Sequence, residues 1–193
     1  MRHSRFLAAL AVAALAAALA VLVPAVIPQA GARREVAKRS IPSLGGAAAK
    51  RLLHRIDRHR DETWRWQRMM HAHPTPFRDS ARKIKSVAYR RWVASLWQQR
   101  AVQARQRAMN PPHKREWLCI HRYEGAWNDP GGPYYGGLQM DLEFQDTYGR
   151  ELLRRKGTAD HWTPLEQMWV AERAQRTRGF WPWPNTARYC GLI

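Results

Sequence analysis

The chain has 193 residues and a mass of 22.4 kDa, which leaves room for one ordinary domain with additional segments rather than two full domains. Its 33 Lys and Arg residues against 15 Asp and Glu give a net charge of +18, and a hydrophobic share of 45% argues against disorder throughout. Two cysteines exclude a dense disulfide framework and a four-cysteine zinc site. The absence of P-loop, G-x-G-x-x-G and H-E-x-x-H patterns argues against nucleotide-binding enzymes and zinc peptidases.

An apolar run from Phe6 to Val23 follows two arginines and precedes a small-residue stretch that ends at Ala32. This order predicts a secretory signal peptide over residues 1–32. Because the run is about 18 residues long, an uncleaved membrane anchor is the alternative. In both cases we expect residues 33–193 outside the cytoplasm, secreted or anchored on the extracellular side of the membrane.

Export bears on the two cysteines, Cys119 and Cys190, which lie near the ends of the last segment of the chain. In an oxidising compartment the simplest expectation is one disulfide between them. Two free, buried thiols are the alternative.

The positive charge belongs to the middle of the chain. Residues 33–116 carry 22 basic and 6 acidic side chains, whereas residues 117–193 carry nine of each. Outside a cell, such a basic segment is attracted to anionic wall polymers or to the lipid headgroups of a membrane surface. A solvated helix face without a specific ligand is an equal alternative. Nucleic acid is not an expected partner, because the leader directs the chain out of the cytoplasm.

The composition of the basic part predicts a flexible linker over residues 33–50 and a basic amphipathic helical region over residues 51–112. Two helices are expected there, separated by a proline-rich break and packed as a hairpin or stalk. Asp79 or Ser80 is the expected cap of the second helix. One apolar stripe of that helix consists of Tyr89, Trp92, Val93, Leu96 and Trp97.

Three helices are predicted in the neutral segment, which we assign to residues 113–193. The first runs from Trp117 to Trp127, and Asp141 caps the second, which ends before Gly157. The third begins at a capping box, Thr163-Pro164-Leu165-Glu166, and stops at Gly179.

Glu124 is the candidate chemical group of the first of these helices. It shares a face with Trp117 and His121, and Gly125 directly after it can end the helix. The negative end of the helix dipole and aromatic neighbours disfavour the ionised carboxylate, so this side chain can act as a general acid. His121 and Glu124 are too few to bind a metal ion, and the sequence predicts neither a metal nor a cofactor.

A glycine-rich loop, Tyr134-Tyr135-Gly136-Gly137-Leu138-Gln139, follows. Paired glycines let backbone amides approach a ligand closely. The tyrosine rings and the Gln139 amide offer stacking faces and a paired donor and acceptor, which sugars require. A plain β-hairpin turn is the alternative interpretation.

Four landmarks follow one another in this part of the chain: Glu124-Gly125-x-Trp127, the tyrosine–glycine–glutamine loop, Gln167-x-x-Val170-Ala171-Glu172-Arg173, and Trp183-Pro184 with Cys190. In this order they resemble the catalytic domain of the resuscitation-promoting factors and their transglycosylase-like relatives. The resemblance covers residues 117–193 and implies a mainly α, lysozyme-like α+β domain. In that family the first cysteine directly precedes the glutamate, whereas four residues separate them here.

The resemblance implies cleavage of the peptidoglycan β-1,4 bond between N-acetylmuramic acid and N-acetylglucosamine in the cell wall. It makes Glu124 the catalytic general acid and base, places Tyr135 and Gln139 in the substrate cleft, and pairs Cys119 with Cys190. Tyr134 and Trp127 are further candidate substrate-binding residues.

The sequence leaves the reaction open. The candidates for a second carboxylate are Asp129, Asp141 and Glu143, and none is convincing, which favours a lytic mechanism with Glu124 alone over hydrolysis by water. Two functions of other classes remain. One is a non-catalytic glycan-binding module anchored by the basic helices, and the other is a membrane-active cationic protein.

Overall fold

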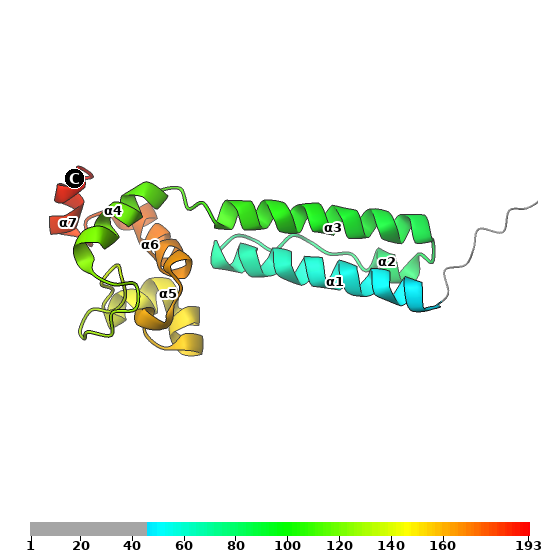
Figure 1. Cartoon of the computed structure of the whole chain (residues 1–193), viewed down its shortest axis with the longest axis horizontal. Coiled ribbons are helices and arrows are strands. Elements are labelled where there is room, and N and C mark those ends of the chain that lie inside the picture. The colour runs from blue at the N-terminus through cyan, green and yellow to red at the C-terminus, as the bar shows by residue number, and fades with distance from the viewer. Residues whose placement is uncertain (1–45) are drawn as a thin grey trace, which may run out of the picture. The chain divides into compact units, whose positions relative to one another are not determined.

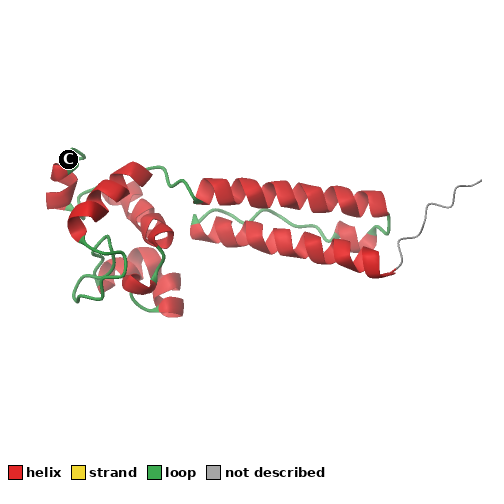
Figure 2. Ribbon diagram, viewed as in Figure 1, coloured by secondary structure: helices red, strands yellow, loops and turns green. Residues whose placement is uncertain are grey.

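The computed structural model describes residues 46–193, and these are mainly helical (Figure 1, Figure 2). The predicted signal segment and the first part of the predicted linker, residues 33–45, lie outside the described residues. The helices are α1 (Gly46–Met69), α2 (Ser80–Lys83), α3 (Val87–Ala108), α4 (Lys114–Glu124), α5 (Leu142–Lys156), a 3-10 turn η1 (Ala159–His161), α6 (Pro164–Arg178) and α7 (Pro184–Tyr189). In the described part of the chain, the single β feature is one antiparallel bridge between Tyr135 and Met140.

The two long helices of the basic region lie side by side and run in the same direction (Figure 1). After α1 the chain returns along it: Thr75 exchanges hydrogen bonds with Gln67 at 2.7 and 2.9 Å, and its carbonyl accepts from Trp64 Nε1 at 2.9 Å. Further back, Arg82 pairs with Asp57 at 2.8 Å. Both helices therefore begin at the same end of the pair. The expected hairpin, in which the two helices would be antiparallel, is wrong. The helices are parallel because the segment between them is long enough to span the length of α1.

Two predicted boundaries of this region also differ from the structure. α1 begins at Gly46, so the last part of the predicted linker is helical. Ser80 starts only the four-residue α2, and α3 begins at Val87, where the Ser86 hydroxyl accepts a hydrogen bond from Tyr89 N at 3.3 Å. The Ser86 cap satisfies one of the free amides at the start of the longer helix.

The core of the helix pair is small and aromatic. Ile56 of α1 packs with Val93 and Trp97 of α3, and Ala81 of α2 covers them. Trp92, from the predicted apolar stripe, instead leaves 57% of its surface exposed. The stripe is therefore only partly a packing face.

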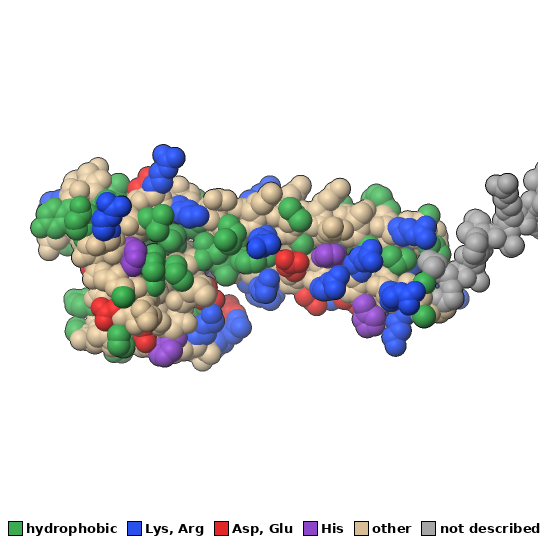
Figure 3. Space-filling view, in the orientation of Figure 1, with side chains coloured by type: hydrophobic (Ala, Val, Ile, Leu, Met, Phe, Trp, Pro, Cys, Tyr) green, Lys and Arg blue, Asp and Glu red, His purple; other side chains and the backbone are tan. Residues whose placement is uncertain are grey.

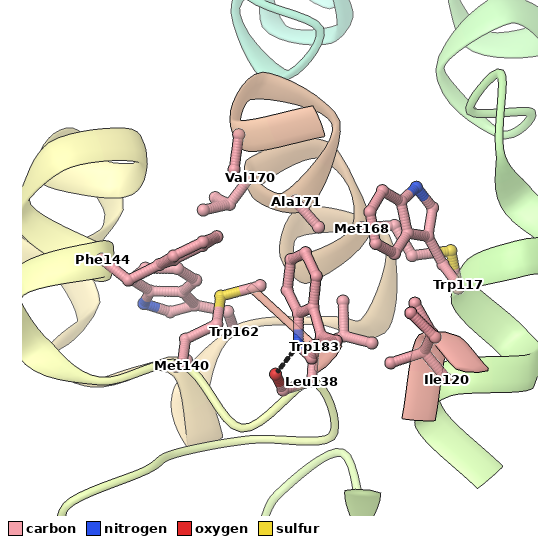
Figure 4. Close-up of a cluster of buried hydrophobic side chains, with 13 residues drawn as sticks. Trp117, Ile120, Leu138, Met140, Phe144, Trp162, Met168, Val170, Ala171 and Trp183 are labelled. Atoms are coloured by element: carbon pink, nitrogen blue, oxygen red, sulfur yellow. Dashed lines mark hydrogen bonds between the residues drawn. The ribbon is translucent and has the colours of Figure 1, made fainter. Parts of the chain in front are cut away.

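A separate core is formed by residues 117–192, with α6 running through it (Figure 4). Val170 and Ala171 of α6 are fully buried against aromatic and aliphatic side chains from the segments around them. The predicted signals at both helix starts are confirmed. Asp141 accepts from Phe144 N at 2.7 Å at the start of α5, and Thr163 and Glu166 form a reciprocal capping box at the start of α6.

The two C-terminal indoles of the Trp-Pro motif differ in burial. Trp183 is buried and its Nε1 donates to the Leu138 carbonyl at 2.6 Å, whereas Trp181 is 62% exposed (Figure 4). Trp183 thereby fastens the glycine-rich loop to the core. Within residues 46–193, no helix has the length and apolar character needed to cross a bilayer.

Candidate functional site

Glu124 is the last residue of α4. The helix starts at Lys114 rather than at Trp117, and it stops three residues before the predicted end at Trp127. Gly125 forms the cap, and its amide donates to the His121 carbonyl at 3.3 Å. The half-buried carboxyl group is thus held at the negative end of a helix, as expected from its position before a glycine.

The carboxyl group of Glu124 is linked to α7. Thr186 Oγ1 lies 2.7 Å from Glu124 Oε1, and Thr186 is buried. Glu124 makes no second side-chain hydrogen bond with any described residue, so its Oε2 remains available to a ligand. Thr186 and α7 were missed by sequence reasoning. Pro184, a residue type favoured at the first position of a helix, is the signal that indicates this helix.

The predicted disulfide between Cys119 and Cys190 is confirmed, with a Cα–Cα distance of 6.1 Å. It connects α4 to the residue that caps α7. Because the same two helices carry Glu124 and Thr186, the disulfide supports the contact between those side chains.

The glycine-rich loop is a narrow turn closed by two hydrogen bonds between Tyr135 and Met140, each 3.0 Å long. Neighbouring side chains of the protein leave no room for a Cβ atom on Gly136 or Gly137. A Cβ atom on Gly136 would lie 2.7 Å from Gln167 Oε1, and one on Gly137 would lie 2.6 Å from His121 Nδ1. The close approach that these glycines permit is therefore to the protein's own side chains, in contrast to the expected approach to a ligand.

Gln139 connects this turn to the region of Glu124. Its Nε2 donates to Asp129 Oδ2 at 2.9 Å and to the Gly136 carbonyl at 3.0 Å. Asp129 Oδ1 accepts from Gly131 N at 3.0 Å. Asp129 Oδ2 is also close to Gly125, since a Cβ there would lie 3.2 Å from it. Both hydrogens of the Gln139 amide are used internally, which leaves its carbonyl oxygen as the group available to a ligand.

A small cavity of about 90 Å³ lies beside Gln139. Tyr134, which is half exposed, and Gln139 both line it, together with Asp141. The remaining lining residues are Met140, Phe144, Arg178, Pro182 and Trp183. Two predicted binding residues thus share this cavity, whereas Glu124 is not part of its wall. A larger cavity of about 780 Å³ includes none of the predicted site residues.

The other two predicted binding residues, Tyr135 and Trp127, are half-buried and pack against the core. The Trp127 indole stacks on the His121 ring with 3.9 Å between centroids, and its carbonyl accepts from Gln167 Nε2 at 2.7 Å. His121 Nδ1 in turn lies 3.1 Å from the Gly137 carbonyl. These contacts hold the loop and the end of α4 together.

Two further carboxylates are engaged in the structure of the domain. Glu172, from the motif of α6, is almost fully buried and accepts from Trp117 Nε1 at 2.9 Å and from His113 N at 2.8 Å. Burial raises the pKa of Glu166, but hydrogen bonds from Lys156 and Thr163 outweigh burial and hold that pKa below its ordinary value. Within the described residues, no three His, Cys, Asp or Glu side chains gather as a metal site would require.

Comparison with known proteins yields no relative: no family model, no curated protein and no solved structure matches the chain.

Proposed function

We propose that the protein is an exported enzyme that cleaves the peptidoglycan β-1,4 bond between N-acetylmuramic acid and N-acetylglucosamine, with Glu124 as general acid and base. The observation that carries the proposal is the setting of Glu124, which ends α4 and whose one side-chain hydrogen bond among residues 46–193 joins its Oε1 to Thr186. A general acid must bring a free oxygen within hydrogen-bond reach of the leaving group. The motif resemblance to the resuscitation-promoting factors supplies the substrate class.

Substrate binding is assigned to the turn beside Glu124. Tyr134 offers an exposed ring for a sugar face, and the Gln139 carbonyl oxygen can accept a hydrogen bond from a sugar hydroxyl or amide. Tyr135 and Trp127, which are half-buried, are assigned to the same binding region. In this proposal the lysozyme-like fold has the glycine-rich turn as one wall of the cleft.

The contacts of the other carboxylates favour a lytic reaction with a single glutamate. Asp141 caps α5 and Asp129 holds the turn, so neither is free to activate water. Protonated Glu124 gives its proton to the glycosidic oxygen, and the bond from that oxygen to C1 of the muramic acid breaks. The Glu124 carboxylate then takes the proton of the muramic acid's C6 hydroxyl. The oxygen of that hydroxyl bonds to C1 at the same time, which forms a 1,6-anhydro sugar.

Hydrolysis by water, as in a muramidase, would require another carboxylate, and Glu143 is the exposed acid available for this role. A non-catalytic glycan-binding module is the second candidate function. It is favoured by the cavity beside Gln139, which Glu124 does not line.

Export is supported by the Cys119–Cys190 disulfide, because such bonds persist in oxidising compartments. The protein is then secreted or held on the extracellular side of the membrane, and associated with the cell wall. No cofactor is part of the proposal.

The test is digestion of purified peptidoglycan by the chain from Arg33 onward, with mass spectrometry of the released muropeptides. Wild type and the control Glu143→Gln should both release anhydro-muramic ends, and Glu124→Gln should release none. Release of reducing ends by wild type, and loss of that release in Glu143→Gln, would show that the reaction is hydrolysis and not lytic cleavage. Equal inactivity of folded wild type and Glu124→Gln, together with retention on peptidoglycan, would instead establish the binding module.

A further inference from the structure

Several chain segments meet at one end of the helix pair. Because α1 and α3 are parallel, their N-termini meet there, together with α2 and the loop of residues 84–86. The chain enters the helix pair at this same end, at Gly46 (Figure 1). Two helix N-termini also bring the positive ends of two helix dipoles to one surface.

Two large apolar side chains are exposed at this end. Trp92 is 57% exposed and Ile84 is 42% exposed. The Trp92 ring lies 5.7 Å from that of Tyr89, and the Tyr89 hydroxyl is 2.7 Å from Ser80 Oγ at the start of α2. An exposed indole suits a boundary between water and an apolar phase, because its ring is apolar while its N–H can still reach water.

Basic residues neighbour these two residues in the chain, and others lie at the start of α1. Those that are exposed and form no ion pair with any residue from 46 to 193 are Lys50, Arg51, Lys83, Lys85 and Arg91. The nearby acids, Asp57 and Asp79, are both paired with Arg82. Figure 3 shows blue Lys and Arg side chains at this end of the helix pair and others further along it. The net field of the surface is therefore strongly positive.

We propose that this surface, defined by Ile84, Trp92, Lys83, Lys85 and Arg91, binds a bilayer that contains anionic lipids. The indole and the isoleucine enter the headgroup region while the basic side chains contact lipid phosphates. A soluble anionic polymer would account for the charge but not for the exposed apolar pair.

The position of the surface in the chain argues for the same partner. The apolar run that ends at Val23 is followed by only 22 residues before Gly46, where the chain reaches this end of the helix pair. If the leader stays in the membrane, this surface is the part of residues 46–193 tethered most closely to the bilayer. The inference does not rest on the proposed enzymatic function, since none of its residues belongs to the region of Glu124.

The experiment is co-sedimentation of the chain from Arg33 with vesicles of phosphatidylcholine alone or mixed with phosphatidylglycerol. This chain contains the whole compact unit Ile41–Ile193, with both hydrophobic cores and the disulfide. Binding to the mixed vesicles alone is expected. Each basic residue near an anionic surface contributes a factor of about five, so Lys83→Gln with Lys85→Gln should weaken partitioning about 25-fold. Ile84→Ser with Trp92→Ser should weaken it about tenfold.

The matched controls lie at the opposite end of α3. Arg105→Gln with Arg107→Gln removes the same charge, and Val102→Ser removes a side chain that is 51% exposed. Both controls should bind vesicles within about twofold of wild type, and circular dichroism checks that every variant is folded. Absence of binding to the mixed vesicles would overturn the proposal, and so would an equal loss in the arginine control. Unchanged binding of the Ile84/Trp92 variant would also overturn it, since charge alone, as for a wall polymer, would then be sufficient.

Discussion

Thr186 is suited to hold Glu124 in both protonation states that the proposed reaction requires. Its hydroxyl donates to the ionised carboxylate at 2.7 Å. When the carboxyl group is protonated it can itself donate to the Thr186 oxygen, because the hydroxyl hydrogen can turn to the Trp183 carbonyl, 3.4 Å away. Thr186 is therefore a positioning residue that can adapt as the proton leaves and returns.

We expect Thr186→Val to lower the rate of anhydro-product release by about tenfold to a hundredfold, because the Glu124 carboxyl group loses its hydrogen bond from Thr186 and its fixed orientation. Thr186→Ser, which keeps the hydroxyl, should retain most of the activity. The rate is measured on variants that circular dichroism shows to be folded, and recovery in Thr186→Ser separates loss of the hydrogen bond from a general structural defect. Thr186→Val with the rate of wild type would show that the hydrogen bond has no role.

Gly137 is a second residue on which the site depends. A Cβ atom there would lie 2.6 Å from His121 Nδ1 and 2.9 Å from the Cα atom of Trp127, and the backbone atom cannot rotate away. Gly137→Ala should therefore lower the free energy of unfolding by about 1–3 kcal/mol, as overpacking does. Urea denaturation measures this change. Gly46→Ala is the control, because no atom of the described residues lies within 4 Å of the added methyl group, and an equal effect in both variants would contradict the close contact.

At the scale of single residues, the sequence predicted those that have a local signal. Glu124 stands directly before a glycine, and the two cysteines have no other partner, so the carboxyl group at the helix end and the disulfide both followed. Thr186 lies 62 positions after Glu124, and no local pattern brings the two together. The engagement of Gln139 by Asp129 was missed for a related reason: it depends on the path of an irregular loop.

At the scale of elements, the capping box of α6 gives a pH-dependent contribution to stability. The pKa of Glu166 lies below its ordinary value because the hydrogen bonds from Lys156 and Thr163 outweigh burial. A carboxyl group with a lowered pKa in the folded state contributes stability above its ordinary pKa and loses it as the pH falls through the folded value. The midpoint temperature of thermal unfolding, measured from neutral to acidic pH, should therefore fall more steeply in wild type than in Glu166→Gln. Glu143→Gln, an exposed control in α5, should follow wild type. Parallel curves for wild type and Glu166→Gln would refute this contribution.

Helix ends were predictable where a side chain caps them, and the direction of packing was not. Asp141 and Thr163 mark the starts of α5 and α6 because each accepts a hydrogen bond from an amide of the first turn. The proline-rich break after α1 is equally compatible with a hairpin and with a return to the beginning of the helix. The return is fixed by bonds from Trp64 and Gln67 to Thr75, which are contacts between side chains and a loop that carry no periodic signal.

At the scale of the whole molecule, charge and the candidate site are kept in different parts of the chain. The basic helix pair has its own core around Ile56 and Trp97, and the neutral region has another around Trp117 and Val170. This separation was visible in the sequence, because all of the net charge falls before residue 117. In the proposal above, the surface at the start of α3 binds an anionic bilayer, and none of its basic residues belongs to the neutral region that carries Glu124.

The disulfide affects the stability of the neutral region and the proposed site together. It closes a loop with a sequence separation of 71, and chain entropy gives such a cross-link about 4 kcal/mol of stability. Cys119→Ser with Cys190→Ser should therefore lower the free energy of unfolding by about this amount, as measured by urea denaturation. Because Thr186 reaches Glu124 from the helix that the disulfide ties to α4, the folded variant should also release less product than wild type at low temperature. A reductant should lower the free energy of unfolding of wild type to that of the variant and leave the variant's value unchanged. Equal stability of wild type and the variant under oxidising conditions would refute the role of the cross-link.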